Sequence, residues 1–74
     1  MSIKIVRKVV TSVDFKRKTP NGHVVWIVRF DDNTSATTKP DSTFGLSLTG
    51  SEQGLYSVEI DGRGRIVGWE KEEA

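Results

Sequence analysis

The stretch that decides the fold is TPNGHVVWIVRF, residues 19–30. Its Asn21-Gly22 pair is a strong signal for a tight hairpin, because both residues tolerate a positive φ. The run that follows alternates, and one face of it is formed by Val24, Trp26, Val28 and Phe30. A period of two is typical of a strand with one buried face. We therefore predict a hairpin whose second arm is a central strand.

The first arm of this hairpin, residues 3–16, has the same period of two. The expected core face is formed by the apolar odd positions Ile3, Ile5, Val9, Val13 and Phe15. Val9 and Val10 are adjacent, so they place apolar side chains on both faces, and the stretch is long for a strand. A bulge or bend is therefore predicted near these two valines.

Turn residues divide the remainder of the chain. Asp31-Asp32-Asn33 predicts a turn before a polar strand over residues 34–38, since these side chains hydrogen-bond their own backbone. Asp61-Gly62-Arg63-Gly64 predicts a second turn, between strands over residues 55–60 and 65–69. The charged tail, residues 70–74, is expected to fray.

A short helical segment is predicted between the third and fourth strands. Asp41 or Ser42 is a suitable N-cap, and Phe44 and Leu48 then share one face of the segment. Gly45 in its middle lowers helix propensity by about 1 kcal/mol relative to alanine. We therefore expect no more than one or two turns, or a 3₁₀ segment.

The predicted fold is all-β with one short helix: a small five-stranded antiparallel barrel forming a single domain over residues 1–74. The order is strand, strand, strand, short helix, strand, strand. A helix between the third and fourth strands is the OB-like arrangement. An SH3-like barrel and an open sheet with the helix packed across it also fit this order.

The composition excludes several classes of protein. The chain has 74 residues and no cysteine, which removes thiol chemistry and cysteine-based zinc sites. No run approaches the ~18 apolar residues of a membrane span, and no apolar signal-peptide core is present at the start. We therefore expect a cytoplasmic protein without a membrane partner.

Catalytic chemistry is not expected. His23 is the single histidine and stands beside a predicted turn, where a solvated hairpin residue is the commoner role. Asp31 and Asp32 lie on a predicted turn, and the residues around them lack the length and the terminal glutamate of a calcium loop. The motif 62–65 lacks the strand-loop-helix context of a phosphate loop. No enzyme activity, cofactor or metal site is predicted.

The net charge of +1 conceals a division along the chain. Residues 1–29 hold seven Lys or Arg against one Asp, whereas residues 30–74 hold four against nine acidic residues, giving +6 and −5. The two halves either neutralise each other across paired strands or form a bipolar surface.

Single-stranded nucleic-acid binding is one candidate function. Five cations near the first and last hairpins would form a positive collar if those loops meet: Lys16, Arg17, Lys18, Arg63 and Arg65. Single-strand binders combine such a groove with exposed aromatic side chains. Five aromatic residues fall on expected core faces, namely Phe15, Trp26, Phe30, Tyr56 and Trp69. Tyr56 and Trp69 are the expected exceptions to burial, because each has a polar atom that needs a partner.

Protein–protein interaction is the competing and favoured function. Four apolar residues lie opposite the expected core positions on the first two strands: Val6, Val10, Val25 and Ile27. If nothing covers them, they form an apolar patch of the kind that marks an interface. A chain this short builds a small core, so a homo-oligomer is also expected.

The sequence resembles the small orphan proteins encoded by tailed phages of actinobacteria. The resembling features are Asn21-Gly22 leading into residues 25–28, the acidic turn with residues 34–38, and Asp41-Ser42 with Gly45. The match ends with residues 61–67. The resemblance implies a phage accessory protein in the host cytoplasm, whose partner is a host or phage protein, and it transfers no functional residue.

Overall fold

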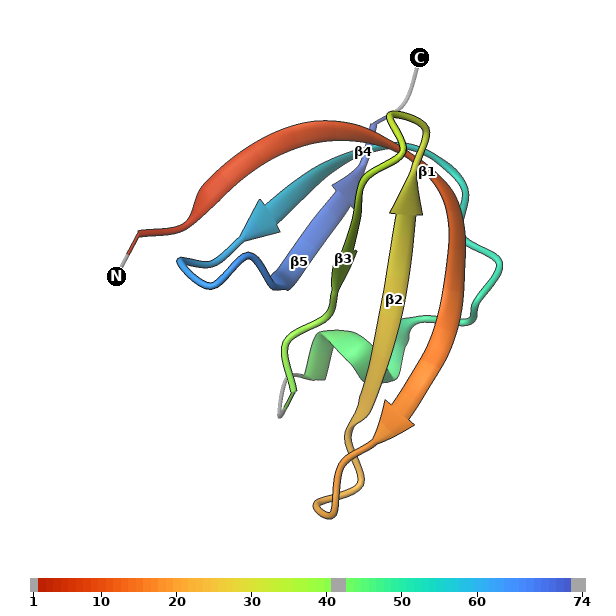
Figure 1. Cartoon of the computed structure of the whole chain (residues 1–74), viewed down its shortest axis with the longest axis vertical. Coiled ribbons are helices and arrows are strands. Elements are labelled where there is room, and N and C mark those ends of the chain that lie inside the picture. Colours follow the sequence, from red (N-terminus) through yellow and green to blue (C-terminus); the bar gives the residue numbers. More distant parts are fainter. Residues whose placement is uncertain (1, 41–42, 73–74) are drawn as a thin grey trace.

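The computed structural model describes residues 2–40 and 43–72. It contains five strands and a short 3₁₀ helix, and the strands form one antiparallel sheet in the order β3-β2-β1-β4-β5 (Figure 1). The elements are β1 (Lys4–Lys18), β2 (Val24–Phe30), β3 (Ser35–Thr37), η1 (Thr43–Ser47), β4 (Gly54–Ile60) and β5 (Ile66–Lys71). The predicted all-β fold and its element order are confirmed, including the short segment between the third and fourth strands.

β1 joins the two halves of the molecule. Its first half, up to Val10, pairs with β4, and its second half pairs with β2, so the strand arches across the fold (Figure 1). Register shifts between Val10 and Ser12 and between Phe15 and Arg17 mark two irregularities in the β1–β2 pairing. Extra residues of this kind bend a strand and increase its twist. The predicted bulge is therefore confirmed, close to its predicted position.

The sheet curls without closing. Its edge strands β3 and β5 meet through one isolated parallel bridge between Thr38 and Ile66, where the Lys39 N–H donates to the Ile66 carbonyl oxygen at 2.8 Å. Of the arrangements left open by the sequence, this order is the OB-like one, a five-stranded and partly open barrel. The expectation of a barrel is corrected in this respect, since continuous pairing does not join the two edges.

The turns form where the sequence placed them. Gly22 has a φ of 87°, and its N–H donates to the Thr19 carbonyl oxygen at 3.0 Å. Asn33 also has a positive φ, of 67°, in the turn between β2 and β3. The turn between β4 and β5 begins at Asp61, whose carboxylate accepts the N–H groups of Arg63 and Arg65, both at 2.9 Å. Turn chemistry is local, so the sequence alone predicts it well.

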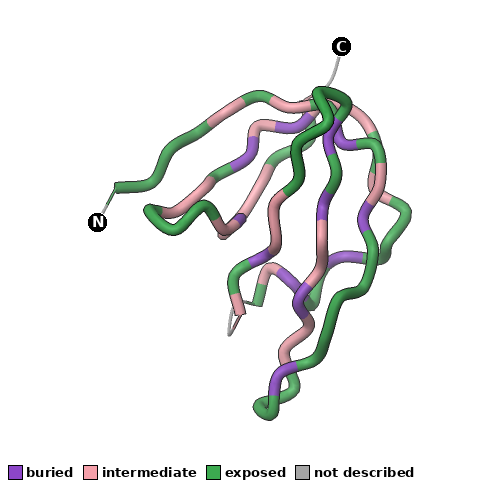
Figure 2. Tube along the Cα trace, viewed as in Figure 1, coloured by how far each residue is buried: buried purple, intermediate pink, exposed green. Residues whose placement is uncertain are grey.

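One apolar core fills the concave side of the sheet. Its buried members come from β1, β2, β4, β5 and the segment after η1: Val10, Val13, Val28, Phe30, Leu48, Tyr56, Val58 and Ile66. Buried positions recur along the strands, separated by less buried ones (Figure 2). Phe44 and Leu48, which were predicted to share one face, both pack on this core. The proposed N-caps Asp41 and Ser42 lie outside the described residues.

The face assignment of β1 was wrong in its first half. Val6 and Val10 face the core, whereas Ile5 and Val9 face outward and are 66% and 38% exposed. The bulge after Val10 shifts the alternation by one position, so that Val13 faces inward again. The predicted core face therefore holds only beyond the bulge.

The C-terminal tail is also more ordered than predicted. Glu70 and Lys71 belong to β5, and the Glu72 carboxylate accepts a hydrogen bond from the Ser57 hydroxyl at 3.0 Å. Residues 73 and 74 lie outside the described residues.

Candidate interaction surfaces

The predicted apolar interface does not form. Val10 and Val25 are 1% and 2% exposed, and Val6 packs against the core. Ile27 is half-buried on the outer side of β2, opposite Asp14 of β1. Val6 and Val10 face the core because the bulge in β1 turns its even positions inward, and Val25 on β2 is closed to a partner by its own burial.

A different apolar surface is exposed on the outer side of β1. We call it the outer stripe; it consists of Ile5 and Val9 on the strand and of Ile3 just before it, and these residues are 66%, 38% and 51% exposed. Val9 lies opposite Leu55 of β4, itself half-buried, which widens the stripe by one side chain. The sequence showed the alternation of these residues, but only the position of the bulge decides which face they occupy.

Acidic side chains border the outer stripe on β4 and β5. Directly paired residues point to the same face of a sheet, so Glu59, opposite Ile5, lies on the outer face. Its carboxylate oxygen is 3.5 Å from where a Cβ on Gly68 would lie, so it extends over that glycine. Glu70 lies opposite Ser57 on the same face. We call Glu59 and Glu70 the acidic flank; both are exposed, and neither forms an ion pair within the described part of the chain.

The far end of β1 is basic. Lys16, Arg17 and Lys18 are exposed, and among residues 2–40 and 43–72 they have no carboxylate partner. Phe15 beside them is 58% exposed and meets Trp26 edge to face, with ring centroids 6.2 Å apart. We call these four residues the basic hairpin. It joins an accessible aromatic ring to three unpaired cations.

Trp26 fixes this end of the fold. Its indole Nε1–H donates to the Gly45 carbonyl oxygen of η1 at 2.7 Å, and its backbone N–H donates to the Thr38 hydroxyl at 2.9 Å. The ring that supports Phe15 is therefore held from two sides. Phe15 consequently rests on a rigid neighbour.

The predicted positive collar is not assembled. The turn holding Arg63 and Arg65 lies beside β4 and β5, well apart from the tip of the β1–β2 hairpin (Figure 1). Arg65 is also engaged by Asp61, with its Nη2 3.1 Å from the carboxylate oxygen. Bonds from the Arg65 and Arg63 N–H groups outweigh burial and lower the pKa of Asp61. Arg65 thus stabilises the turn, whereas the Arg63 side chain is exposed and forms no ion pair within the part of the chain that the structure describes.

The division of charge is only partly neutralised. Arg7 pairs with Glu72 at 3.3 Å and Lys8 pairs with Asp32, so two bridges link the basic and acidic halves of the sequence. Hydrogen bonds from the Lys8 ammonium and from Thr34 lower the pKa of Asp32 to about 2. Two groups of the remaining charges are concentrated, namely three cations on the basic hairpin and two carboxylates on the acidic flank.

The aromatic residues depart from the predicted pattern. Tyr56 is 5% exposed and stacks on Trp69 at 4.2 Å between ring centroids, so these two are not the exposed exceptions. Burial raises the pKa of Tyr56, and the Glu52 charge adds to the increase. Phe15 is the accessible ring instead: it is 58% exposed and meets the ring of Trp26 edge to face.

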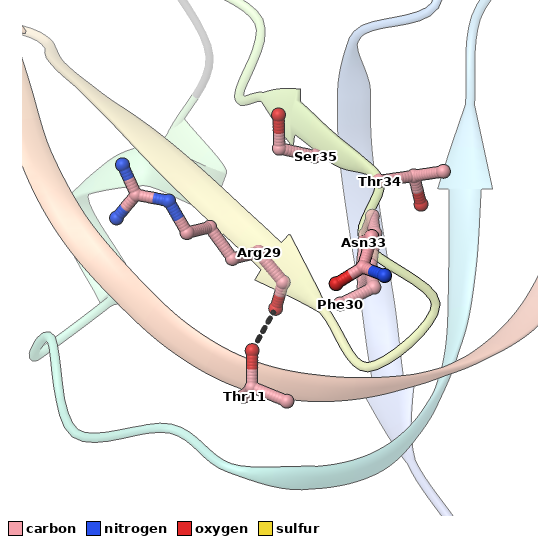
Figure 3. A pocket seen from close by; sticks show the side chains of 6 residues that line it. All are labelled: Thr11, Arg29, Phe30, Asn33, Thr34 and Ser35. Atoms are coloured by element: carbon pink, nitrogen blue, oxygen red, sulfur yellow. Dashed lines mark hydrogen bonds between the residues drawn. The ribbon is translucent and has the colours of Figure 1, made fainter.

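A shallow depression lies at the turn between β2 and β3 (Figure 3). It has a volume of about 300 Å³ and is lined by Thr11, Arg29, Phe30, Asn33, Thr34 and Ser35. Its main polar groups already have partners: the Thr11 hydroxyl donates to the Arg29 carbonyl oxygen at 3.1 Å, and the guanidinium of that arginine binds Asp14 at 2.8 Å. The depression is therefore lined by hydroxyl groups and one side-chain amide, and its lining residues include no acid–base pair of the kind that catalysis uses.

Among the described residues, no group of three His, Cys, Asp or Glu side chains is placed to hold a metal ion. No helix in that part of the chain is long and apolar enough to cross a membrane. The comparisons with known proteins found no matching family model, no similar curated protein and no similar solved structure.

Proposed function

We propose that this chain is a non-enzymatic protein-interaction module that self-associates through the outer stripe. The observation that supports the proposal is the exposure of three large aliphatic side chains along one strand face, with Ile5 at 66%. Arg7 lies between Ile5 and Val9 on the same face, so these apolar side chains flank its ion pair with Glu72. Exposed apolar surface bordered by polar groups marks interaction sites in small proteins. A second copy that covers these side chains would add to the limited apolar burial of a 74-residue domain.

Sedimentation velocity over a concentration series tests this proposal. We expect the average mass of the wild type to rise above 8.2 kDa with concentration, and we expect Ile5→Ser to weaken that rise. Leu46→Ser is the matched control, because Leu46 is 56% exposed but lies on η1, away from the outer stripe. A monomeric wild type at every concentration, or equal behaviour of the two variants, would contradict the proposal.

Single-stranded nucleic-acid binding is a second candidate, and the basic hairpin supports it. An exposed aromatic ring beside unpaired cations is the combination on which bases stack while phosphates are neutralised. The three cations of the basic hairpin form a small positive surface for phosphate binding, and Arg63 and Arg65 do not extend it as predicted. We therefore place this candidate second.

Fluorescence anisotropy with a labelled oligothymidine tests the second candidate. Phe15→Ala should weaken binding by about tenfold, since base stacking on one ring contributes about 1–3 kcal/mol. Leu46→Ala should leave binding unchanged. Binding should also fall steeply as salt is raised. No anisotropy change at low salt would remove this candidate.

The setting of the module is proposed on the resemblance alone. Small phage proteins of this kind act in the host cytoplasm, so a host or phage protein is the second class of partner after another copy of the chain. Affinity capture from infected cells, with Ile5→Ser as the control bait, would test this. Recovery of the same proteins by both baits would contradict a role for the outer stripe.

A further inference from the structure

We propose that copies of this chain associate head to tail, with the basic hairpin of one copy docked on the outer stripe and acidic flank of the next. The inference rests on the proposed self-association and adds which two surfaces meet. Three independent features carry it: the charges of the two surfaces, their apolar groups, and their separate positions on the fold.

The two surfaces carry opposite charge. The basic hairpin holds three exposed cations and no acidic residue. The outer face around the outer stripe holds Arg7 against Glu59, Glu70 and Glu72, and only Glu72 of these carboxylates is paired with the arginine. A positive surface that meets a negative one steers association and fixes its register.

The same charges disfavour the symmetric alternatives. Two outer faces placed together would bring Glu59 and Glu70 of one copy near the same carboxylates of its partner. Two basic hairpins placed together would oppose six cations. Like-charge juxtaposition across an interface costs several kcal/mol, whereas hairpin against outer face has neither conflict. Of the three pairings between these surfaces, the heterologous one is electrostatically favoured.

The apolar groups of the two surfaces also match. The basic hairpin presents one exposed aromatic ring, Phe15, at its base. The outer stripe presents Ile5 and Val9 on one strand, with Leu55 beside Val9. A central aromatic side chain on an aliphatic surface, surrounded by charged pairs, is the usual composition of an energetically important contact.

The positions of the two surfaces dictate the kind of assembly. The tip of the basic hairpin lies at the bottom of the view in Figure 1, and β4 and β5 lie at the upper left. A single chain therefore cannot bring its own hairpin onto its own outer face. Heterologous contacts of this kind form rings or open chains of copies. Each surface consists of only a few side chains, so the association should be weak and visible only at high protein concentration.

Charge reversal on each surface, followed by mixing, tests the inference. One variant carries Lys16→Glu, Arg17→Glu and Lys18→Glu, and the other carries Glu59→Lys and Glu70→Lys. Each variant alone has two surfaces of the same sign, so its self-association should weaken by about tenfold or more. A mixture of equal amounts restores opposite signs at every contact and should recover association to within about threefold of wild type.

The control carries Lys39→Glu and Arg63→Glu, which reverse two exposed cations outside both surfaces and should leave association unchanged. Circular dichroism and urea unfolding check that every variant is folded. A hairpin-reversed chain that associates like the wild type, or a mixture that stays monomeric, overturns the head-to-tail contact. If the wild type associates and neither charge-reversed variant changes that association, the head-to-tail contact is overturned but the proposed self-association stands. A monomeric wild type contradicts the self-association and the head-to-tail contact together.

The hairpin-reversed variant also distinguishes a nucleic-acid site. Loss of oligonucleotide binding together with unchanged self-association would assign the basic hairpin to nucleic acid and overturn the head-to-tail contact. Recovery of self-association in the mixture, by contrast, has no explanation in nucleic-acid binding and supports it.

Discussion

Gly45→Ala is the substitution whose effect the structure predicts most sharply. A Cβ at this position would lie less than 3.0 Å from the backbone carbonyl oxygen of Val24, which cannot rotate away. The 3₁₀ helix η1 must therefore move off β2. That movement breaks the hydrogen bond from the Trp26 indole to the Gly45 carbonyl oxygen, which is 2.7 Å long in the structure.

The expected loss combines two terms. An unsatisfied, partly buried donor costs about 1–3 kcal/mol, and overpacking costs a similar amount, so the total is about 2–6 kcal/mol. A domain of this length has only about 4–11 kcal/mol of stability. In urea, with a slope of about 1 kcal/mol/M, the unfolding midpoint should fall by about 2 M or more. Tryptophan fluorescence reports the change directly, because the Trp26 indole loses its hydrogen bond to the Gly45 carbonyl oxygen.

Two other glycines serve as controls for the same assay. Gly62→Ala meets nothing within 4 Å and has an ordinary φ, so its midpoint should be unchanged. Gly22→Ala also has open space but adopts a φ of 87°, so it should lose about 1 kcal/mol from backbone strain alone. A Gly45→Ala variant within about 0.5 kcal/mol of Gly62→Ala would refute the close contact between η1 and β2.

Two further predictions concern stability. Ile66 is fully buried at the only bridge between the sheet edges described here, so Ile66→Ala should cost about 2–5 kcal/mol by thermal unfolding, and a loss below about 1 kcal/mol would contradict its place in the core. Lys8 and Thr34 hold the pKa of Asp32 at about 2, below its ordinary 3.8. A folded-state pKa below the unfolded one stabilises the protein above about pH 4, and this stabilisation is lost as the pH falls toward 2. Asp32→Asn should therefore be less sensitive to acid across that window, and an equal acid response of variant and wild type would count against the contact.

The sequence was most informative where structure is local. Asn21-Gly22 and the turn at Asp61 were predicted because each depends on residues within a few positions. The order of the elements along the chain followed from these turns together with the alternating runs. Phe44 and Leu48 were predicted to share a face, and the structure shows that both pack on the core.

The face of β1 was less predictable. It depends on where the bulge falls, and that is set by pairing with β2 and β4 at once. One shifted position moved Val10 into the core and Ile5 to the surface, which reversed the predicted interface. Val25 shows a second limit of prediction from alternation, because it lies on the outer side of β2 and is nevertheless only 2% exposed.

The structural role of Gly45 could not be predicted from its helix propensity. In the sequence it was a residue that weakens a helix, whereas in the fold it is the position where η1 approaches the backbone of β2. Phe15 was expected in the core because most large apolar side chains are buried. Its position at the end of β1, beyond the closely packed core, left it exposed.

Self-association driven by complementary surfaces is the central claim, and its salt dependence in the wild type is the most direct test. Sedimentation velocity at about 0.05 M and about 0.5 M NaCl, over the same concentration series, separates screened charge contacts from purely apolar ones. We expect an average mass that rises above 8.2 kDa with concentration at low salt and returns toward 8.2 kDa at high salt. A mass of 8.2 kDa throughout, or association that strengthens with salt, would contradict the account.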